Sequence, residues 1–114
     1  EAAFRDHKNV KLLAFVHAET STGVRSDADA LCAIAKKYGA MTIVDAVTSL
    51  GGIPVEVDGW GADAVYSGSQ KCLSAPPGLS PVTRLRLELS RVNSSSCHRS
   101  PFTSDDARHS IVKA

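Results

Sequence analysis

The sequence predicts an α/β fold, because short apolar runs of strand length alternate with one amphipathic helical pattern. The apolar runs lie at residues 10–16, 41–44 and 62–67, and the helical pattern covers residues 26–39. Apolar stretches of about four to eight residues between turn-forming residues are typical of buried strands. Strand, helix and strand in this order form a βαβ unit, which has parallel strands and a right-handed crossover.

The first strand leads through a polar turn into the helix. Residues 10–16 read VKLLAFV, and the turn-forming segment 19–23 (ETSTG) follows them. We expect the helix to begin near Ser26, a residue type that caps helix N-termini well. Asp27 and Asp29 would then lie in the first turn, where negative charge is favourable beside the positive end of the helix dipole.

The helix is expected to bury one face and to end before Gly39. Lys36 and Lys37 suit the negative C-terminal end of a helix, and glycine is the usual residue in the left-handed position after it. The apolar residues share one helical face: Ala30, Leu31, Ile34, Ala35 and Tyr38.

Two further strands are expected after the helix. Residues 41–44 (MTIV) form a continuous apolar run, which predicts burial on both faces, as in a parallel sheet. Residues 53–57 predict a brief extended segment, and residues 62–67 (ADAVYS) predict a third strand.

Polar segments follow the three expected strands at residues 19–23, 45–49 and 67–71. Ligands of open parallel sheets bind beyond the carboxyl ends of the strands, so we expect these segments to converge on one rim. They supply hydroxyls, the carboxylate of Asp45, and Lys71 in a Gly/Ser-rich turn whose donors suit a phosphate. Pyridoxal phosphate needs a lysine amine and an acid beside its ring nitrogen.

Each polar segment also has a purely structural explanation. The hydroxyls of segment 19–23 could cap and turn the chain, Asp45 could accept backbone N–H bonds, and Lys71 could be a solvated loop residue. Nucleotide-binding motifs are absent, since the sequence contains neither GxxxxGK[ST] nor GxGxxG.

Composition excludes several classes of protein. The formal net charge is +1, which gives no global electrostatic case for nucleic acid, and no apolar run is long enough to span a membrane. Cys32, Cys72 and Cys97 are far apart and lack CxxC spacing, so we expect neither disulfides nor a zinc site. Cys32 and Cys72 are interpreted as structural thiols. The first residue is Glu1, which we interpret as a sign of a processed chain or a fragment.

The chain divides at residue 83. Residues 1–83 hold seven basic and nine acidic residues, whereas residues 84–114 hold six and three. The second part has no glycine and is rich in Arg and Ser, so we expect an irregular or disordered polar tail. Alternation of Leu85, Leu87 and Leu89 could form a strand within it. An RNA-binding arm is the alternative, although Phe102 is its sole aromatic.

Four segments of the chain resemble the class V aminotransferases. Within that family the resemblance is greatest to the alanine–glyoxylate, serine–pyruvate and serine–glyoxylate aminotransferases, and it covers about residues 10–83. The four segments, in order, are HAETSTGV at 17–24, IVDAVTSLGG at 43–52, YSGSQK at 66–71 and SAPPG at 74–78.

The resemblance implies a role for each matching site residue. Lys71 matches the lysine that forms a Schiff base with pyridoxal 5'-phosphate and shuttles the substrate proton. Asp45 matches the carboxylate paired with the pyridinium nitrogen, and Thr20 matches a hydroxyl residue near the cofactor ring. Gln70 matches a ligand of the cofactor phosphate, and Ser69 lines the same turn.

The resemblance also implies a function. We expect an aminotransferase that moves the amino group of alanine or serine to glyoxylate or pyruvate. The fold would be part of a fold type I large domain, mostly parallel sheet with covering helices, and the longer parent protein would be a homodimer. The expected partners are small amino acids and 2-oxo acids, not nucleic acid or membrane. The default location is cytoplasmic, with peroxisomes or mitochondria open if the source is eukaryotic.

Three alternatives remain open. Gln70 stands where cysteine desulfurases usually carry His, which argues against a desulfurase-like lyase, and a phosphonate aminotransferase is also similar around Asp45. The third alternative is a non-catalytic remnant, because family enzymes are considerably longer. Since the resemblance ends near Thr83, residues 84–114 are hypothesised to be out of frame, and reading the gene in its other frames tests this.

Overall fold

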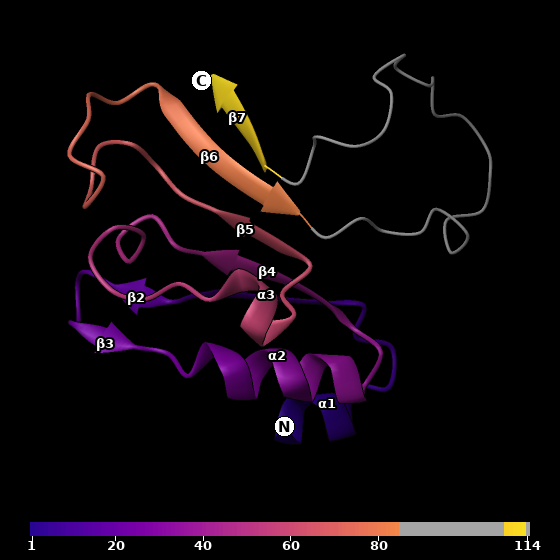
Figure 1. The fold of residues 1–114 in the computed structure, drawn as a ribbon. Coiled ribbons are helices and arrows are strands. Elements are labelled where there is room, and N and C mark those ends of the chain that lie inside the picture. The colour runs from indigo at the N-terminus through magenta and orange to yellow at the C-terminus, as the bar shows by residue number, and fades with distance from the viewer. Residues whose placement is uncertain (85–108, 114) are drawn as a thin grey trace, which may run out of the picture.

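The computed structural model describes residues 1–84 and 109–113, which form a mixed sheet with helices (Figure 1). The strand order is β1-β4-β5-β6-β7, with β1, β4 and β5 parallel and with β6 and β7 joined antiparallel. The strands are β1 (Leu12–Val16), β2 (Ala18–Glu19), β3 (Val24–Arg25), β4 (Met41–Asp45), β5 (Ala64–Tyr66), β6 (Leu79–Arg84) and β7 (His109–Lys113). The helices are α1 (Ala2–Asp6), α2 (Ala28–Lys37) and α3 (Val57–Trp60).

The expected α/β fold and its three parallel strands are confirmed. Helix α2 connects β1 to β4, and Gly39 follows it with a φ of +69°, as the left-handed position after a helix requires. The expected N-cap is wrong by one residue. Asp27, not Ser26, accepts the N–H of Ala30 at 3.1 Å, because the Ser26 hydroxyl donates to the carbonyl of Val16 at 2.7 Å.

One local expectation differs from the structure, and another is confirmed in a more specific form. In the expected extended segment 53–57, Ile53 forms an isolated bridge with Leu50, and Val57 already begins α3. The polar turn at 19–23 is the tip of a small hairpin, in which β2 pairs antiparallel with β3.

The end of the chain is partly described. The expectation of an irregular tail is wrong for His109–Lys113, because this segment forms strand β7 and pairs with β6. Strand β6 itself crosses the expected boundary at residue 83. The proposed strand at residues 85–89, Cys97 and Phe102 lie outside the described residues.

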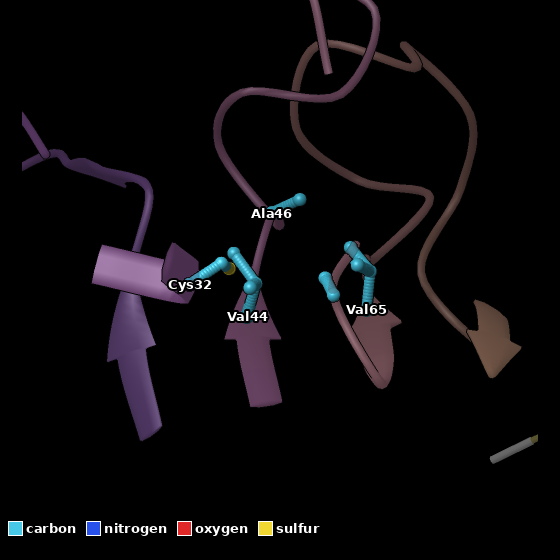
Figure 2. Packing of buried hydrophobic residues seen from close by; sticks show 5 residues of the cluster. Cys32, Val44, Ala46 and Val65 are labelled. Atoms are coloured by element: carbon cyan, nitrogen blue, oxygen red, sulfur yellow. The ribbon is translucent and has the colours of Figure 1, made fainter. Parts of the chain in front are cut away.

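The core lies between α2 and one face of the sheet. Figure 2 shows Cys32 of α2 beside Val44 of β4, with Val65 of β5 and Ala46 in the same cluster. Cys32 is 2% exposed, as expected of a structural thiol, and burial raises its pKa. Helix α3 lies next to α2 and adds Trp60 to this cluster.

The opposite face of the parallel strands has no helix over it among the described residues. Alternate residues of β1, β4 and β5 point to this face, including the row formed by Val16, Asp45 and Tyr66. Leu12, Val16, Met41 and Tyr66 are all exposed. Burial of β4 on both faces, which its continuous apolar sequence predicted, is therefore not seen in this part of the chain.

Within the described part of the chain, none of the helices is both long enough and apolar enough to cross a bilayer.

Candidate functional site

The three polar segments meet at the carboxyl ends of the parallel strands, as the sequence predicted. The backbone N–H of His17 donates to the carbonyl of Asp45 at 2.9 Å, which joins the ends of β1 and β4. Thr48, in the second polar segment, contacts the first segment at Thr20 and the residue that follows the third segment, Cys72. Its hydroxyl lies 2.8 Å from that of Thr20, and its carbonyl accepts the thiol of Cys72 at 3.0 Å. Thr48 was not among the expected site residues, because a threonine in a loop carries no signal of its own.

Asp45 is the last residue of β4, and its two carboxylate oxygens have different partners. One oxygen, Oδ1, accepts the backbone N–H of Val47 at 2.9 Å, and the other, Oδ2, accepts the hydroxyl of Tyr66 at 2.6 Å. The Val47 bond corresponds to the structural explanation considered for Asp45, since a helical turn starts there with Leu50 donating to the carbonyl of Ala46. Asp45 is only half-buried, and it borders a shallow pocket on the uncovered face together with Val16 and Tyr66.

Lys71 lies in the turn after β5 and is exposed. Among the described residues its Nζ has no hydrogen-bond or ion-pair partner, which leaves the amine available to a ligand. Its charge acts on Glu19 at the end of β2. The pKa of Glu19 is lowered chiefly by the N–H and hydroxyl of Ser21, and the positive charge of Lys71 lowers it further.

The turn before Lys71 is held by buried serines. The hydroxyl of Ser67 donates to the carbonyl of Ala46 at 3.0 Å, and that of Ser69 donates to the carbonyl of Pro76 at 2.6 Å. Both serines therefore support the backbone of the turn, and the cofactor contact expected of Ser69 remains a prediction.

Gln70 is the exposed amide of the same turn, and its side chain folds back over Gly68. A Cβ on Gly68 would lie 2.6 Å from Oε1 of Gln70, so a larger residue at position 68 would displace this exposed side chain from its present position. An exposed amide beside an exposed amine can donate to an anionic group at this rim.

The donor set fits pyridoxal phosphate in chemical type. It comprises a free amine on Lys71, a carboxylate on Asp45, an exposed amide on Gln70 and an exposed hydroxyl on Thr20. In the described part of the chain, no hydrogen bond or ion pair joins Asp45 directly to Lys71 or Gln70; the structure brings their segments together through Thr48. No group of three or more His, Cys, Asp or Glu side chains suited to a metal occurs among these residues.

His17 is a second buried polar side chain near these strand ends, on the side of the sheet that α2 covers. Its side chain is 4% exposed and packs edge-on against Trp60, with ring centroids 4.8 Å apart. Its Nδ1 is buried without a hydrogen-bond partner among the described residues, and it borders a pocket of about 330 Å³. Burial lowers the pKa of His17, and the charge of Arg25 lowers it further. The sequence contained no signal for this ring pair, because His17 and Trp60 lie far apart along the chain.

The lowered pKa of His17 predicts that stability falls in mild acid. Below the ordinary histidine pKa of about 6.5 the unfolded chain binds a proton that folded His17 does not, so the free energy of unfolding should decrease from about pH 8 to about pH 5. Urea unfolding followed by circular dichroism measures this slope. His17→Phe keeps an aromatic ring beside Trp60 and should flatten the slope, whereas exposed His7→Gln should leave it unchanged. Equal slopes in all three proteins would contradict the assignment.

Comparison with known proteins gives one consistent family. The family model described as Aminotransferase class-V matches residues 3–91, a range wider than the expected 10–83 at both ends. The alanine–glyoxylate aminotransferase of Rattus norvegicus is 46% identical over 80 residues, which are 70% of this chain and 19% of that protein. The 2-aminoethylphosphonate–pyruvate transaminase 1 of Burkholderia lata is 41% identical over 98 residues, 84% of this chain and 27% of that protein.

A solved structure has the same fold. The crystal structure of an alanine–glyoxylate aminotransferase from Nostoc sp. superimposes with a TM-score of 0.69 and 45% identity, over 75% of this chain and 22% of that one. The chain thus spans about one fifth of the length of the first curated relatives that it matches.

Proposed function

Because the chain belongs to the class V aminotransferases, we propose that it carries the central cofactor-binding part of a pyridoxal-phosphate-dependent transaminase. The proposed reaction moves the amino group of alanine or serine to glyoxylate or pyruvate. The observation that supports it most directly is the pair of neighbouring strands β4 and β5. The first ends in the carboxylate of Asp45, and the second leads to Lys71, whose amine has no partner among the described residues.

The cofactor, when bound, supplies an aldehyde that condenses with amines and a ring that withdraws electrons from the attached carbon. Asp45 would hold the protonated ring nitrogen, because a carboxylate accepts that N–H and balances its charge. Lys71 would carry the proton at Nζ, removing it from one carbon and returning it to another. Lys71 is exposed and its Nζ has no hydrogen-bond or ion-pair partner among the described residues, so the amine can reach a ligand at this rim.

The remaining site residues would orient the cofactor. Gln70 would donate its amide N–H to the phosphate, and Thr20 would place its hydroxyl near the ring. Ser69 would contribute chiefly through the shape of the turn, because its hydroxyl already donates to Pro76. In the proposed assembly the longer protein is a homodimer that acts on small amino acids and 2-oxo acids.

A second candidate is transfer from an aminophosphonate to pyruvate. It is favoured by the relative from Burkholderia lata, whose match extends over more of this chain than that of the rat enzyme. The two candidates share Lys71 and Asp45 and differ in the amino donor.

Covalent trapping tests the proposal without requiring turnover. The purified chain is incubated with pyridoxal phosphate, reduced with borohydride, digested, and mapped by mass spectrometry. We expect the pyridoxyl group on Lys71 in preference to the other five lysines. An even distribution over all lysines would refute a specific site.

The same assay distinguishes the amino donors. A donor amine that reacts with the bound cofactor releases Lys71, so it lowers trapping at that residue. Alanine and serine should lower it more than 2-aminoethylphosphonate at equal concentration. The opposite order would support the second candidate.

A further inference from the structure

The hydroxyl of Tyr66 makes the shortest hydrogen bond to the carboxylate of Asp45, the expected partner of the cofactor ring nitrogen. It is the last residue of β5 and pairs in register with Asp45, the last residue of β4, so both side chains point to the uncovered face. Its hydroxyl donates to Oδ2 of Asp45 at 2.6 Å, a length typical of a hydrogen bond to an ionised carboxylate.

We propose that Tyr66 is a positioning residue, which fixes the orientation of the Asp45 carboxylate for the ring nitrogen of the cofactor. This inference rests on the proposed function. A carboxylate with one partner can rotate about its terminal bond, whereas Asp45 has a separate donor on each oxygen. The N–H of Val47 binds Oδ1 and the hydroxyl of Tyr66 binds Oδ2, which together set the plane of the group.

The position of Tyr66 in the chain gives the contact a second consequence. Ser67 follows it directly and begins the turn that presents Lys71. The bond from Tyr66 to Asp45 therefore ties the strand that carries the carboxylate to the strand that leads to the amine. Movement of one relative to the other would break a short hydrogen bond.

Packing alone does not account for the hydroxyl. The Tyr66 side chain is 37% exposed and borders a shallow pocket with Val16, Ile43 and Asp45. A phenylalanine would cover the same apolar neighbours, so the hydroxyl adds only the bond to the carboxylate. That bond and partial burial raise the pKa of Tyr66 above its ordinary value of 10.0.

Ionisation of the tyrosine tests the contact without cofactor. Tyr38→Phe leaves Tyr66 as the only tyrosine, and its tyrosinate absorbance is read immediately after rapid jumps to alkaline pH, before unfolding. We expect a midpoint above that of free tyrosine, and a lower midpoint when Asp45→Asn removes the charge. An ordinary midpoint that Asp45→Asn does not change would overturn the inference.

Cofactor affinity tests the positioning role. Tyr66→Phe should weaken binding of pyridoxal phosphate about tenfold, because binding must then also order the carboxylate of Asp45. In an Asp45→Ala background the same change should have almost no effect, because there is no carboxylate left to position. Tyr38→Phe serves as the matched control and should bind as the unaltered chain does.

The outcomes separate the two proposals. Equal losses from Tyr66→Phe in both backgrounds, or no loss in either, would overturn the positioning role while cofactor binding itself stands. Failure of the unaltered chain to bind the cofactor would overturn the proposed function and the positioning role with it. In that case the shifted tyrosine midpoint would still report the contact itself.

Discussion

Replacing Lys71 with alanine is expected to eliminate the borohydride-stable attachment of pyridoxal phosphate to the mapped site. The amine is the nucleophile that condenses with the cofactor aldehyde, and alanine has no group to replace it. The change should leave the fold intact, because Lys71 is exposed and its Nζ has no partner among the described residues. Mass spectrometry of digests made after borohydride reduction gives the yield of the pyridoxyl group on each lysine, and circular dichroism confirms folding.

The matched control is Lys36→Ala. Lys36 is an exposed lysine near the end of α2, remote from the carboxyl ends of the strands, so its loss should not change the yield at Lys71. If Lys71→Ala retained the total incorporation of the unaltered chain, the amine that reacts would be a different one. Lys71 would then lose its assigned role.

Replacing Asp63 with alanine is expected to lower the free energy of unfolding by about 2–3 kcal/mol. Oδ2 of Asp63 accepts both the backbone N–H of Thr42 at 2.7 Å and its hydroxyl at 3.0 Å. The N–H of Asp63 in turn donates to the Thr42 hydroxyl at 3.0 Å. Thr42 is 2% exposed, so alanine would leave two buried donors without their acceptor. Urea unfolding followed by circular dichroism measures the loss.

Two variants make this prediction specific. Asp63→Asn retains a carbonyl oxygen that can accept both bonds, so its cost should be smaller than that of alanine. Asp58→Ala removes an exposed carboxylate from α3 and should change stability little. A cost for Asp63→Ala no greater than that for Asp58→Ala would show that the bridge between β4 and the start of β5 contributes little.

The elements of this fold were predictable because their signals are local. Apolar runs indicate β1, β4 and β5, and apolar residues at helical spacing indicate α2, since periodicity depends on residues within one or two turns. The cap was harder to predict. Ser26 and Asp27 are adjacent and both suitable, and the choice depends on a bond from Ser26 to Val16 ten residues earlier.

The convergence of the site was predictable for a topological reason. Parallel strands present their carboxyl ends at one edge, so the segments that carry Thr20, Asp45 and Lys71 must follow each other across the rim. The partners within the site were not predictable in the same way. The hydroxyls of Ser67 and Ser69, expected near a phosphate, donate to backbone carbonyls that other segments place beside them.

The amino-acid sequence by itself determined the order of strands and helix, the edge of the sheet that carries the polar residues, and the family to which they belong. Tertiary structure alone decided that Tyr66 holds Asp45, that Thr48 joins Thr20 to Cys72, and that His17 is buried against Trp60. The physical reason is distance along the chain. Strand register and helix packing bring together residues more than twenty positions apart, and no local preference of either residue specifies that partner.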